Sequence, residues 1–542
     1  MGRLQAKMWT TFISLAVLVT SAVTQWPHHV YREDWKERTC NRILRQVKHR
    51  HVTVEVPPRL TGQWTSNRCE IRSGPQFVLR SYKFEDSRFE SRLYHYEDPD
   101  CSKPLYAMVA TGTHHLLQES WVIPGTMDAS YRVDDVHLVP YTQEAADRLL
   151  GHLGRHCNVF ASTTFKPFHK YPIIKNFWDK FPGSVDGSKT NDFDCSSPLN
   201  YTLNELQLVR LETRVHHRSQ STNQIIDTNS GNAGSGAGPR SGVVRELLLG
   251  DVHTDMSERQ RHRPTSFQEP LRDAQKSLCG VCTRITKSHE LDPPRLGVHQ
   301  GTLLSLEGEW VSTRCESRQY GQFLTRWLHF LSDSQSWEGR YDYYHDALCR
   351  QPAFTLRAKG SYAGGQEAQV IRGSKSYSFK TTRLKVTPRD DVTVDTLNRY
   401  QGPECGEAGQ WRKNREQDVT KTAGCVTLGI RLPSLEQDLM RMEAVHRKLL
   451  LFVSQRSSDQ PIRPYHEAPP SAFQAPLIKC DAQDLDMSIN SLPEVHGHAM
   501  AMSSLDRFQT PFDDLKGSAS KHRCNLNIIV TACIVFISKL IV

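Results

Sequence analysis

Short runs in which apolar and polar residues alternate fill the sequence between residues 77 and 139. They read FVLRSYKF at 77–84, RFESRLYHY at 88–96, LYAMVATG at 105–112, SWVI at 120–123 and YRVDDVHLV at 131–139. Turn-forming residues, such as Glu85-Asp86-Ser87 and Pro124-Gly125, separate the runs. Alternation with a period of two, broken by turns at short intervals, predicts an antiparallel meander or barrel and therefore a mainly β fold.

Helical patterns are few. An amphipathic stretch runs from Tyr31 to Val47, and QEAADRLLGHLG, which starts at residue 143, predicts a helix that ends at glycines. A third helix is expected near NELQLVRLE at 204–212, with a counterpart in LEQDLMRME at 435–443. The expected fold is thus β-rich, with a few short helices.

One eleven-residue phrase occurs twice. LTGQWTSNRCE at 60–70 returns as LEGEWVSTRCE at 306–316, with seven identical positions. The offset between matching residues is 246 here and 248 from Phe89 onward, which indicates a two-residue insertion near residue 334. Weaker matches follow, such as TSFQEPL at 265–271 and SAFQAPL at 471–477. A period this long predicts two domains with their own cores rather than a solenoid.

The duplication sets the expected domain organisation. We place the first antiparallel β-barrel-like domain, the first copy, at 25–280 and the second copy in tandem at 281–480. Trp64 and Trp310 are expected to anchor the two cores. Residues 219–242 are too polar and glycine-rich to pack, so they predict a flexible insertion in the first copy, and 481–523 form an unpatterned stalk.

Both ends of the chain carry targeting patterns. Basic residues followed by an apolar run and small residues at 1–24 predict a cleaved signal peptide. The segment at 524–542 is apolar and ends the chain, which predicts a membrane anchor. It is either a short span or the removable tail of a glycolipid signal. The protein is expected at the cell membrane, facing the outside of the cell.

Fourteen cysteines in a secreted chain predict disulfides rather than metal or redox chemistry. Six fall in each copy, which predicts two independently cross-linked domains and leaves Cys524 and Cys533 beside the anchor. The twelve are Cys40, Cys69, Cys101, Cys157, Cys195, Cys279, Cys282, Cys315, Cys349, Cys405, Cys425 and Cys480. In CGVC at 279–282, one cysteine closes the first copy and the other opens the second, so a structural role is favoured over thiol exchange or half a zinc site.

The sequence carries little evidence of catalysis. It lacks a nucleophile elbow, a phosphate loop and a zinc-protease helix. GDVHTD at 250–255 resembles a metal-binding stretch, but its counterpart FVSQRS at 452–457 has none of the ligands. A net charge of +9 over 542 residues gives no nucleic-acid footprint. We therefore expect no enzyme, no cofactor, no metal and no nucleic acid, and N-glycosylation at Asn200.

One predicted strand carries an arginine on an otherwise apolar face. The face comprises Val78, Arg80, Tyr82 and Phe84, matched in the second copy by Leu324, Arg326, Leu328 and Phe330. Two interpretations follow. Either these residues form a cavity face in which Arg80 binds a ligand, or Arg80 pairs with an internal acid.

Several long stretches resemble the adenomatosis polyposis coli down-regulated family of membrane-anchored Wnt antagonists. They are GQWTSNRCEIRSGPQFVLRSYKF, LLLGDVHTD, RPTSFQEPL, GEWVSTRCE and GCVTLGIRLP. The likeness covers about 30–480 and is greater to the "-like" paralogue than to the founding member. It implies two tandem β-barrels, binding of acylated Wnt proteins and contact with their co-receptors. It also implies a first barrel with an apolar cavity for an acyl chain.

Two other functions stay open. A cell-surface adhesion or co-receptor module would recognise protein or glycan, with salt-sensitive binding and no lipid. An oxidoreductase would use Cys279 and Cys282 and would show free thiols there.

Overall fold

The structure is a computed structural model, and it describes ten ranges of residues. They are 28–175, 193–216, 242–275, 279–298, 305–332, 334–400, 402–432, 435–445, 448–455 and 471–480. The predicted signal peptide, stalk and anchor lie outside them, as does the predicted insertion except for Gly242. Within the described ranges, no helix combines the length and apolar character needed to cross a membrane.

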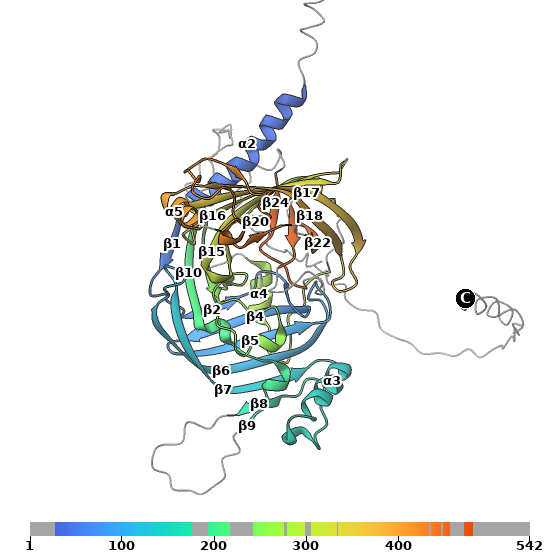
Figure 1. Ribbon diagram of the computed structural model, residues 1–542. Coiled ribbons are helices and arrows are strands. Elements are labelled where there is room, and N and C mark those ends of the chain that lie inside the picture. The colour runs from blue at the N-terminus through green and yellow to red at the C-terminus, as the bar shows by residue number, and fades with distance from the viewer. Residues whose placement is uncertain are drawn as a thin grey trace, which may run out of the picture. The chain divides into compact units, whose positions relative to one another are not determined.

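Eight strands of the first copy form a closed antiparallel barrel (Figure 1). In order around it they are β2 (Gly62–Thr65), β4 (Gln76–Glu85), β5 (Arg88–Tyr96), β6 (Pro104–Glu119), β7 (Met127–Pro140), β10 (Leu208–His216), β11 (Gly242–Leu249) and β12 (Leu271–Asp273). Pairing of β12 with β2 and of β10 with β7 closes the ring. The flanking strands are β1 (Val52–Glu55), β3 (Glu70–Arg72), β8 (Tyr171–Lys175) and β9 (Phe193–Asp194).

The second copy repeats this barrel strand for strand. Its eight strands are β13 (Gly308–Ser312), β15 (Gln322–Leu331), β16 (Ser336–Tyr344), β17 (Pro352–Glu367), β18 (Ser374–Pro388), β22 (Leu435–Val445), β23 (Lys448–Val453) and β24 (Leu477–Lys479). Here β13 pairs with both β24 and β15, which closes the ring. The remaining strands are β14 (Glu316–Arg318), β19 (Gln417–Asp418), β20 (Gly424–Cys425) and β21 (Ile430–Arg431). The predicted mainly β class and the tandem barrels are confirmed.

Alternate side chains along each barrel strand point to the inside and to the outside of the barrel. Along β4, Val78, Tyr82 and Phe84 join the core of the first barrel, whereas Phe77 and Leu79 join a second cluster on its outer side. Successive side chains of a strand point to opposite faces, so a strand buried on both faces is apolar at odd and even positions alike.

The two tryptophans anchor the cores, as predicted. Trp64 and Trp310 are 1% and 0% exposed, and each indole N–H donates to the carbonyl four residues earlier, that of Leu60 at 2.7 Å and that of Leu306 at 2.8 Å. The predicted two-residue insertion near residue 334 is also confirmed, because the turn between β15 and β16 has two more residues than the turn between β4 and β5.

Four α-helices are described: α2 (His28–His49), α3 (Gln143–Leu153), α4 (Gly280–Lys287) and α5 (Asp391–Arg399). Short 3-10 turns are η1 (Asn158–Phe160), η2 (Ser197–Leu199), η3 (Asn204–Gln207), η4 (Met256–Glu258), η5 (Gln319–Gly321) and η6 (Val426–Leu428). The first two predicted helices are confirmed as α2 and α3, and the side chain of Thr142 caps α3 by accepting from the N–H of Ala145.

Two predictions of local structure are wrong. The stretches at 204–212 and 435–443 are not helices, because η3 leads into strand β10 and the second stretch lies within β22. Both faces of β10 are buried, which hides the strand period. The run SWVI at 120–123 is the loop between β6 and β7, where Ile123 is drawn out of the sheet to pack against the second copy.

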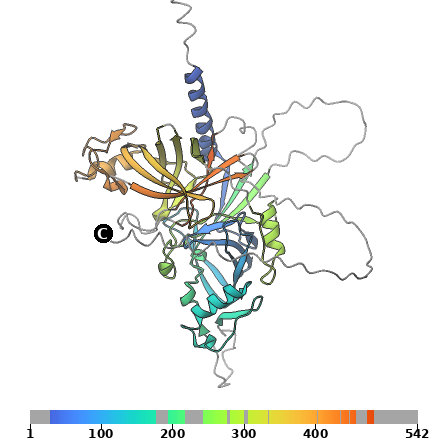
Figure 2. The ribbon, with the colours of Figure 1, turned by 90° about the vertical axis from the view of Figure 1, so that its right-hand side faces the viewer.

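The N-terminal helix of each copy packs against the other copy. Helix α2 buries Cys40, Ile43 and Leu44 against strands of the second barrel, and Figure 2 shows its lower end beside them. Helix α4 buries Val281 and Ile285 against the outer face of the first barrel (Figure 1). The copies that follow one another in sequence have therefore exchanged their first helices.

Six disulfides join the twelve predicted cysteines. The bonds are Cys69–Cys101, Cys157–Cys195, Cys315–Cys349, Cys405–Cys425, Cys40–Cys480 and Cys279–Cys282. The first four lie within a copy and form two equivalent pairs. The last two join the first-helix cysteine of one copy to the final cysteine of the other. The expectation of two independently cross-linked domains is therefore wrong, because the exchanged helices carry their cysteines across.

The contact between the copies is reciprocal. The backbone N–H of Gly74 donates to Ser471 Oγ at 2.8 Å, and their counterparts Tyr320 and Thr265 make the same bond at 3.0 Å. Apolar contacts repeat in the same way. Ile123 and Leu208 meet Phe323, Tyr344 and Cys349, while Ile371 and Leu439 meet Phe77, Tyr96 and Cys101. Contacts that read the same in both directions are typical of an isologous two-fold interface.

Candidate ligand-binding cavity

The second copy supplies most of the apolar lining of a cavity of about 580 Å³. This volume lies within the range of small-molecule sites. Five strands of the second barrel, β15, β16, β17, β18 and β22, contribute apolar side chains to the lining: Leu324, Leu328, Phe330, Trp337, Leu356, Ala358, Phe379, Leu384 and Met440. Since alternate residues of these strands point inward, the regular strand pattern itself gathers these apolar side chains on one wall.

The cavity face predicted for the first copy lies elsewhere. Val78, Arg80, Tyr82 and Phe84 are at most 1% exposed, and none of them lines this cavity. The four counterparts Leu324, Arg326, Leu328 and Phe330 on β15 do line it. The described cavity therefore uses this face of the repeat in the second copy.

A difference in residue type at one pair of equivalent positions, Tyr82 and Leu328, explains part of this. Tyr82 fills space inside the first barrel, where its hydroxyl donates to the carboxylate of Glu205 at 2.8 Å. Burial raises the pKa of Tyr82 well above its usual value, and the nearby Glu205 carboxylate adds to the rise, so the hydroxyl stays a donor. The counterpart Leu328 is smaller and has no hydroxyl, and the counterpart Glu436 lines the cavity.

The arginine on this face pairs with an internal acid in both copies. Arg80 Nε donates to Glu70 at 3.0 Å, and Ser66 Oγ donates to the same carboxylate at 2.6 Å. In the second copy Arg326 Nε and Ser312 Oγ donate to Glu316 at 3.0 and 2.6 Å. This matches the second of the two interpretations of the sequence. In each copy, these Ser, Glu and Arg side chains join a short strand, β3 or β14, to its neighbour, β4 or β15, and form a polar rim of the barrel.

A buried ionic cluster lies where the copies meet, next to the cavity. We call it the interface cluster, and it comprises Arg210, Glu212, Arg214, Glu246, Arg272 and Arg314. Arg314 comes from the second copy and reaches Glu212 at 3.6 Å and Glu246 at 3.4 Å. Burial alone would raise the pKa of Glu246, but Arg314, Arg272 and Arg214 outweigh it and hold the pKa well below its usual range.

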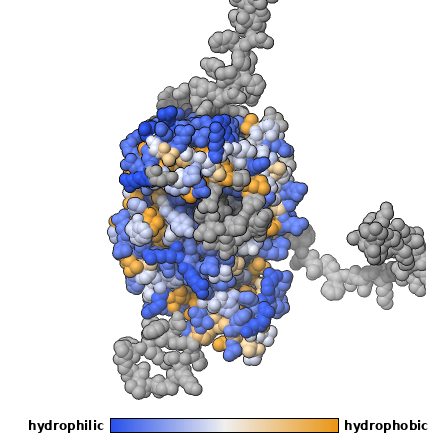
Figure 3. Space-filling model, viewed as in Figure 1, coloured by the Kyte–Doolittle hydropathy of each residue, from blue (hydrophilic) through white to orange (hydrophobic). Residues whose placement is uncertain are grey.

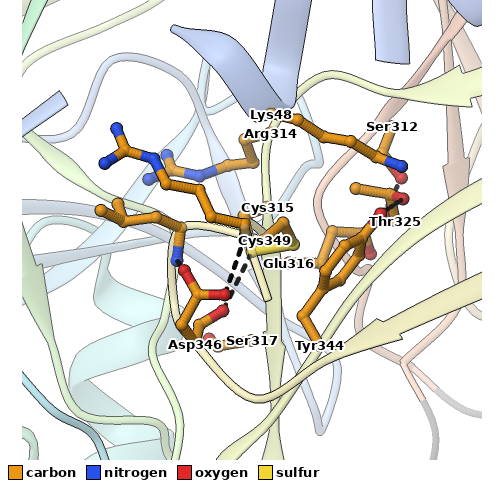
Figure 4. Close-up of a disulfide and its surroundings, with 12 residues drawn as sticks. Lys48, Ser312, Arg314, Cys315, Glu316, Ser317, Thr325, Tyr344, Asp346 and Cys349 are labelled. Atoms are coloured by element: carbon orange, nitrogen blue, oxygen red, sulfur yellow. Dashed lines mark hydrogen bonds between the residues drawn. A yellow bond between two sulfur atoms is a disulfide. The ribbon is translucent and has the colours of Figure 1, made fainter. Parts of the chain in front are cut away.

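A disulfide supports this wall of the cavity. Figure 4 shows Cys315–Cys349 with Arg314 beside it and with Lys48 of α2 reaching toward Tyr344 on the other side. The Lys48 ammonium lies 5.2 Å from the centre of the Tyr344 ring and 3.7 Å from Asp342. The exchanged helix therefore adds to the packing of the second barrel near its site.

The remaining predicted positions lie away from the cavity or serve the fold. Asn200 lies in a turn after η2 and is partly exposed. His253 lies on the cavity wall with its ring nitrogen beside the N–H of Asp255. Within the described ranges, the one group of His, Cys, Asp and Glu close enough to share a metal is Cys40, Glu309 and Cys480, whose two sulfurs already form a disulfide.

The surface has a different character from the interior. Figure 3 shows a mostly hydrophilic face with apolar side chains scattered over it. Among the residues that the structure describes, the most exposed large apolar side chain is that of Trp121, which is 84% exposed in the loop between β6 and β7.

Fold and cavity together define a duplicated, disulfide-bonded β-barrel protein with an internal apolar chamber. The family model of adenomatosis polyposis coli down-regulated 1 matches residues 39–297 and matches a second time at 299–491. The chain therefore belongs to this family. The two matched segments also follow the two copies, which confirms the duplication.

Proposed function

We propose that the protein is an extracellular, membrane-anchored antagonist of Wnt signalling that encloses the acyl chain of Wnt proteins in the second barrel. Family membership supports a role in the Wnt pathway. The single observation that carries lipid capture is the cavity of about 580 Å³, whose part inside the second barrel, the chamber, is lined largely by apolar side chains. We infer binding rather than catalysis, with no cofactor, because the chamber offers apolar surface and paired ions rather than an activated nucleophile.

The energy of such capture is sufficient. Burying an acyl chain gains about 0.8 kcal/mol per methylene, or on the order of 10 kcal/mol gross for a long chain. Ordering the chain and losing translational freedom offset a part of this gain. The surplus corresponds to useful affinity, and enclosing the lipid would withhold it from a receptor.

The direct test uses the soluble chain from residue 28 to residue 480. We expect it to capture acylated Wnt and to lose most of this binding when the Wnt carries no acyl chain. Equal capture of both forms would remove the chamber from the mechanism. Salt-sensitive capture without lipid would instead favour the adhesion or co-receptor function.

A filled chamber provides the matched variant. Ala358 lines the chamber from β17 and is 4% exposed, so Ala358→Trp places a large ring in the lipid's space. Ala161→Trp makes the same change at an exposed position outside the barrel. We expect Ala358→Trp to lose acyl-dependent capture and Ala161→Trp to keep it, with melting curves confirming that both variants fold.

A further inference from the structure

Two counterpart residue pairs on the cavity wall behave differently. In the second copy, Arg318 Nη2 donates to Gln474 Oε1 and to Glu316 Oε2, both at 2.5 Å. The counterparts in the first copy are Arg72 and Gln268, and both line the same cavity. Among the described residues, Arg72 Nε, Arg72 Nη2 and Gln268 Oε1 are buried and have no hydrogen-bond partner. The Arg–Gln hydrogen bond of the second copy is therefore absent from the first, where the equivalent donor and acceptor atoms have no partner.

The neighbouring groups are already occupied. Glu70 accepts from Arg80 and Ser66, and Glu205 accepts from Tyr82. Arg259 donates to the carbonyls of His253 and Ser73 and to Gln76. These groups leave Arg72 without a carboxylate of its own.

The orientation of Gln268 is fixed by its other end. Its Nε2 donates to the carbonyl of Gly250 at 2.6 Å, just as Gln474 Nε2 donates to the carbonyl of Ser454 at 2.7 Å. The amide oxygen of Gln268 is therefore an acceptor in need of a donor, while the Arg72 guanidinium is a donor in need of an acceptor.

Leaving these groups open is unfavourable for the fold alone. Buried donors and acceptors without partners lose the hydrogen bonds that water would give them, and the penalty is larger for a charged group. Burial lowers the pKa of Arg72, and the neighbouring Arg80 lowers it further, which agrees with a desolvated guanidinium in a cationic setting. Such a feature is common where a protein binds a ligand.

We propose that Arg72 and Gln268 hold the polar head of the acyl ligand. An oxygen of a carboxylate or ester accepts from the Arg72 guanidinium, and a hydroxyl or amide N–H next to it donates to Gln268 Oε1. The apolar chamber then holds the chain of the same molecule. This assignment rests on the proposed function, and it adds a determinant for the head group. Two sources carry the acceptor oxygen for Arg72, a free fatty acid and an acyl ester on a serine of a protein. Of the two, the ester on a protein also brings an amide N–H for Gln268.

The test compares ligands that differ only at the head. The probes are a long-chain fatty acid, the alcohol of the same chain length and a peptide with the same chain esterified to serine, each titrated against the chain from 28 to 480. Charge-assisted hydrogen bonds predict that the wild type prefers the acid over the alcohol by roughly 10- to 100-fold. Arg72→Met should abolish this preference and leave the affinity for the alcohol within about twofold, and Arg72→Lys should retain part of it.

The peptide separates the two sources. Weaker binding of both acid and peptide by Arg72→Met assigns the site to the shared head group, and weaker binding of the acid alone assigns it to a free fatty acid. An acid preference that survives Arg72→Met overturns the assignment and leaves the chamber intact. A wild-type chain that binds none of the three probes overturns the proposed function as well.

A stability measurement removes the remaining ambiguity. Since the Arg72 guanidinium has open positions in the free protein, Arg72→Met should leave the melting temperature unchanged or raise it. Arg318→Met, the matched variant in the second copy, should lower it because Glu316 and Gln474 lose a partner. An equal loss in both variants would make Arg72 a structural residue and refute its role in binding.

Discussion

Glu246 lies at the centre of the interface cluster, and its replacement by glutamine tests how the two copies are held together. Its carboxylate contacts Arg214 at 2.8 Å, Arg272 at 3.2 Å and Arg314 at 3.4 Å, and the side chain is 2% exposed. Glu246→Gln keeps the shape but leaves the cluster's arginines facing Glu212 as the only remaining carboxylate of the cluster. Removing one partner of a buried ion pair costs about 3–5 kcal/mol, because the other charges stay desolvated.

The assay is guanidinium chloride unfolding of the chain from 28 to 480 with its disulfides intact. Glu144→Gln is the control, because Glu144 and its partner Arg148 are 83% and 67% exposed and lie one helical turn apart. An exposed pair of this kind contributes about 0.3–0.5 kcal/mol. Equal losses of stability in the two variants would refute the argument that the buried cluster joins the copies.

Acid titration gives the same test an independent readout. Burial opposes ionisation of Glu246 and Glu212, but the arginines lower the pKa of both carboxyls from the usual 4.5. A carboxyl whose pKa is lower in the folded state contributes stability that is fully present above about pH 4.5 and is lost as the pH falls through the folded pKa. The wild type should lose stability below pH 4.5, and Glu246→Gln should lose less over the same range.

Three further predictions follow from single sites. Gly112→Ala should destabilise the first barrel by at least about 3 kcal/mol in the same unfolding assay, because the added Cβ would lie 2.0 Å from the carbonyl oxygen of Arg132; a loss below 1 kcal/mol would contradict this close approach. Burial, with Arg72 and Arg259, lowers the pKa of His95 to about 3 from 6.5. The contribution of His95 to the free energy of unfolding is therefore fully present above pH 6.5 and is lost as the pH falls toward 3. His95→Phe should flatten the dependence of stability on pH between these values, and an unchanged slope would show that His95 does not cause it. Replacing both Cys40 and Cys480 by serine should raise the rate of proteolysis within α2. Hydrogen exchange should show that the first barrel stays protected. A uniform loss of protection in both barrels would contradict a local role for this disulfide.

Much of the barrel could be predicted from local patterns. The runs at 77–84 and 88–96 lie within paired strands, because a period of two with turns at short intervals leaves a chain few other ways to bury its apolar face. The repeated phrase around Trp64 and Trp310 predicted the second barrel as well. The stretch at 204–212 was misread as a helix because β10 is buried on both faces, so that Arg210 and Glu212 lie in the interface cluster instead of in water.

The candidate site could be predicted only in part. The alternation along β4 predicted a cavity face in the first copy, whereas the described cavity uses the equivalent face of β15. Whether a barrel is filled depends on side-chain volume, since Tyr82 with its bond to Glu205 occupies space that Leu328 leaves open. No sequence signal distinguished Arg72 from Arg318, which have the same residue type and the same place in the repeat.

Sequence alone determined the two-fold repetition, the strands β4 to β7 and the identity of the cysteines that form disulfides, because these depend on neighbours within a few residues or on direct comparison of the copies. Only the tertiary structure decided which barrel each copy's first helix packs against. The helix with Cys40 crosses to a barrel whose bonded cysteine lies 440 residues away, and such a choice depends on the packing of two complete surfaces. The open positions of Arg72 and Gln268 arise in the same way, since a hydrogen bond forms or fails according to the space around both of its ends.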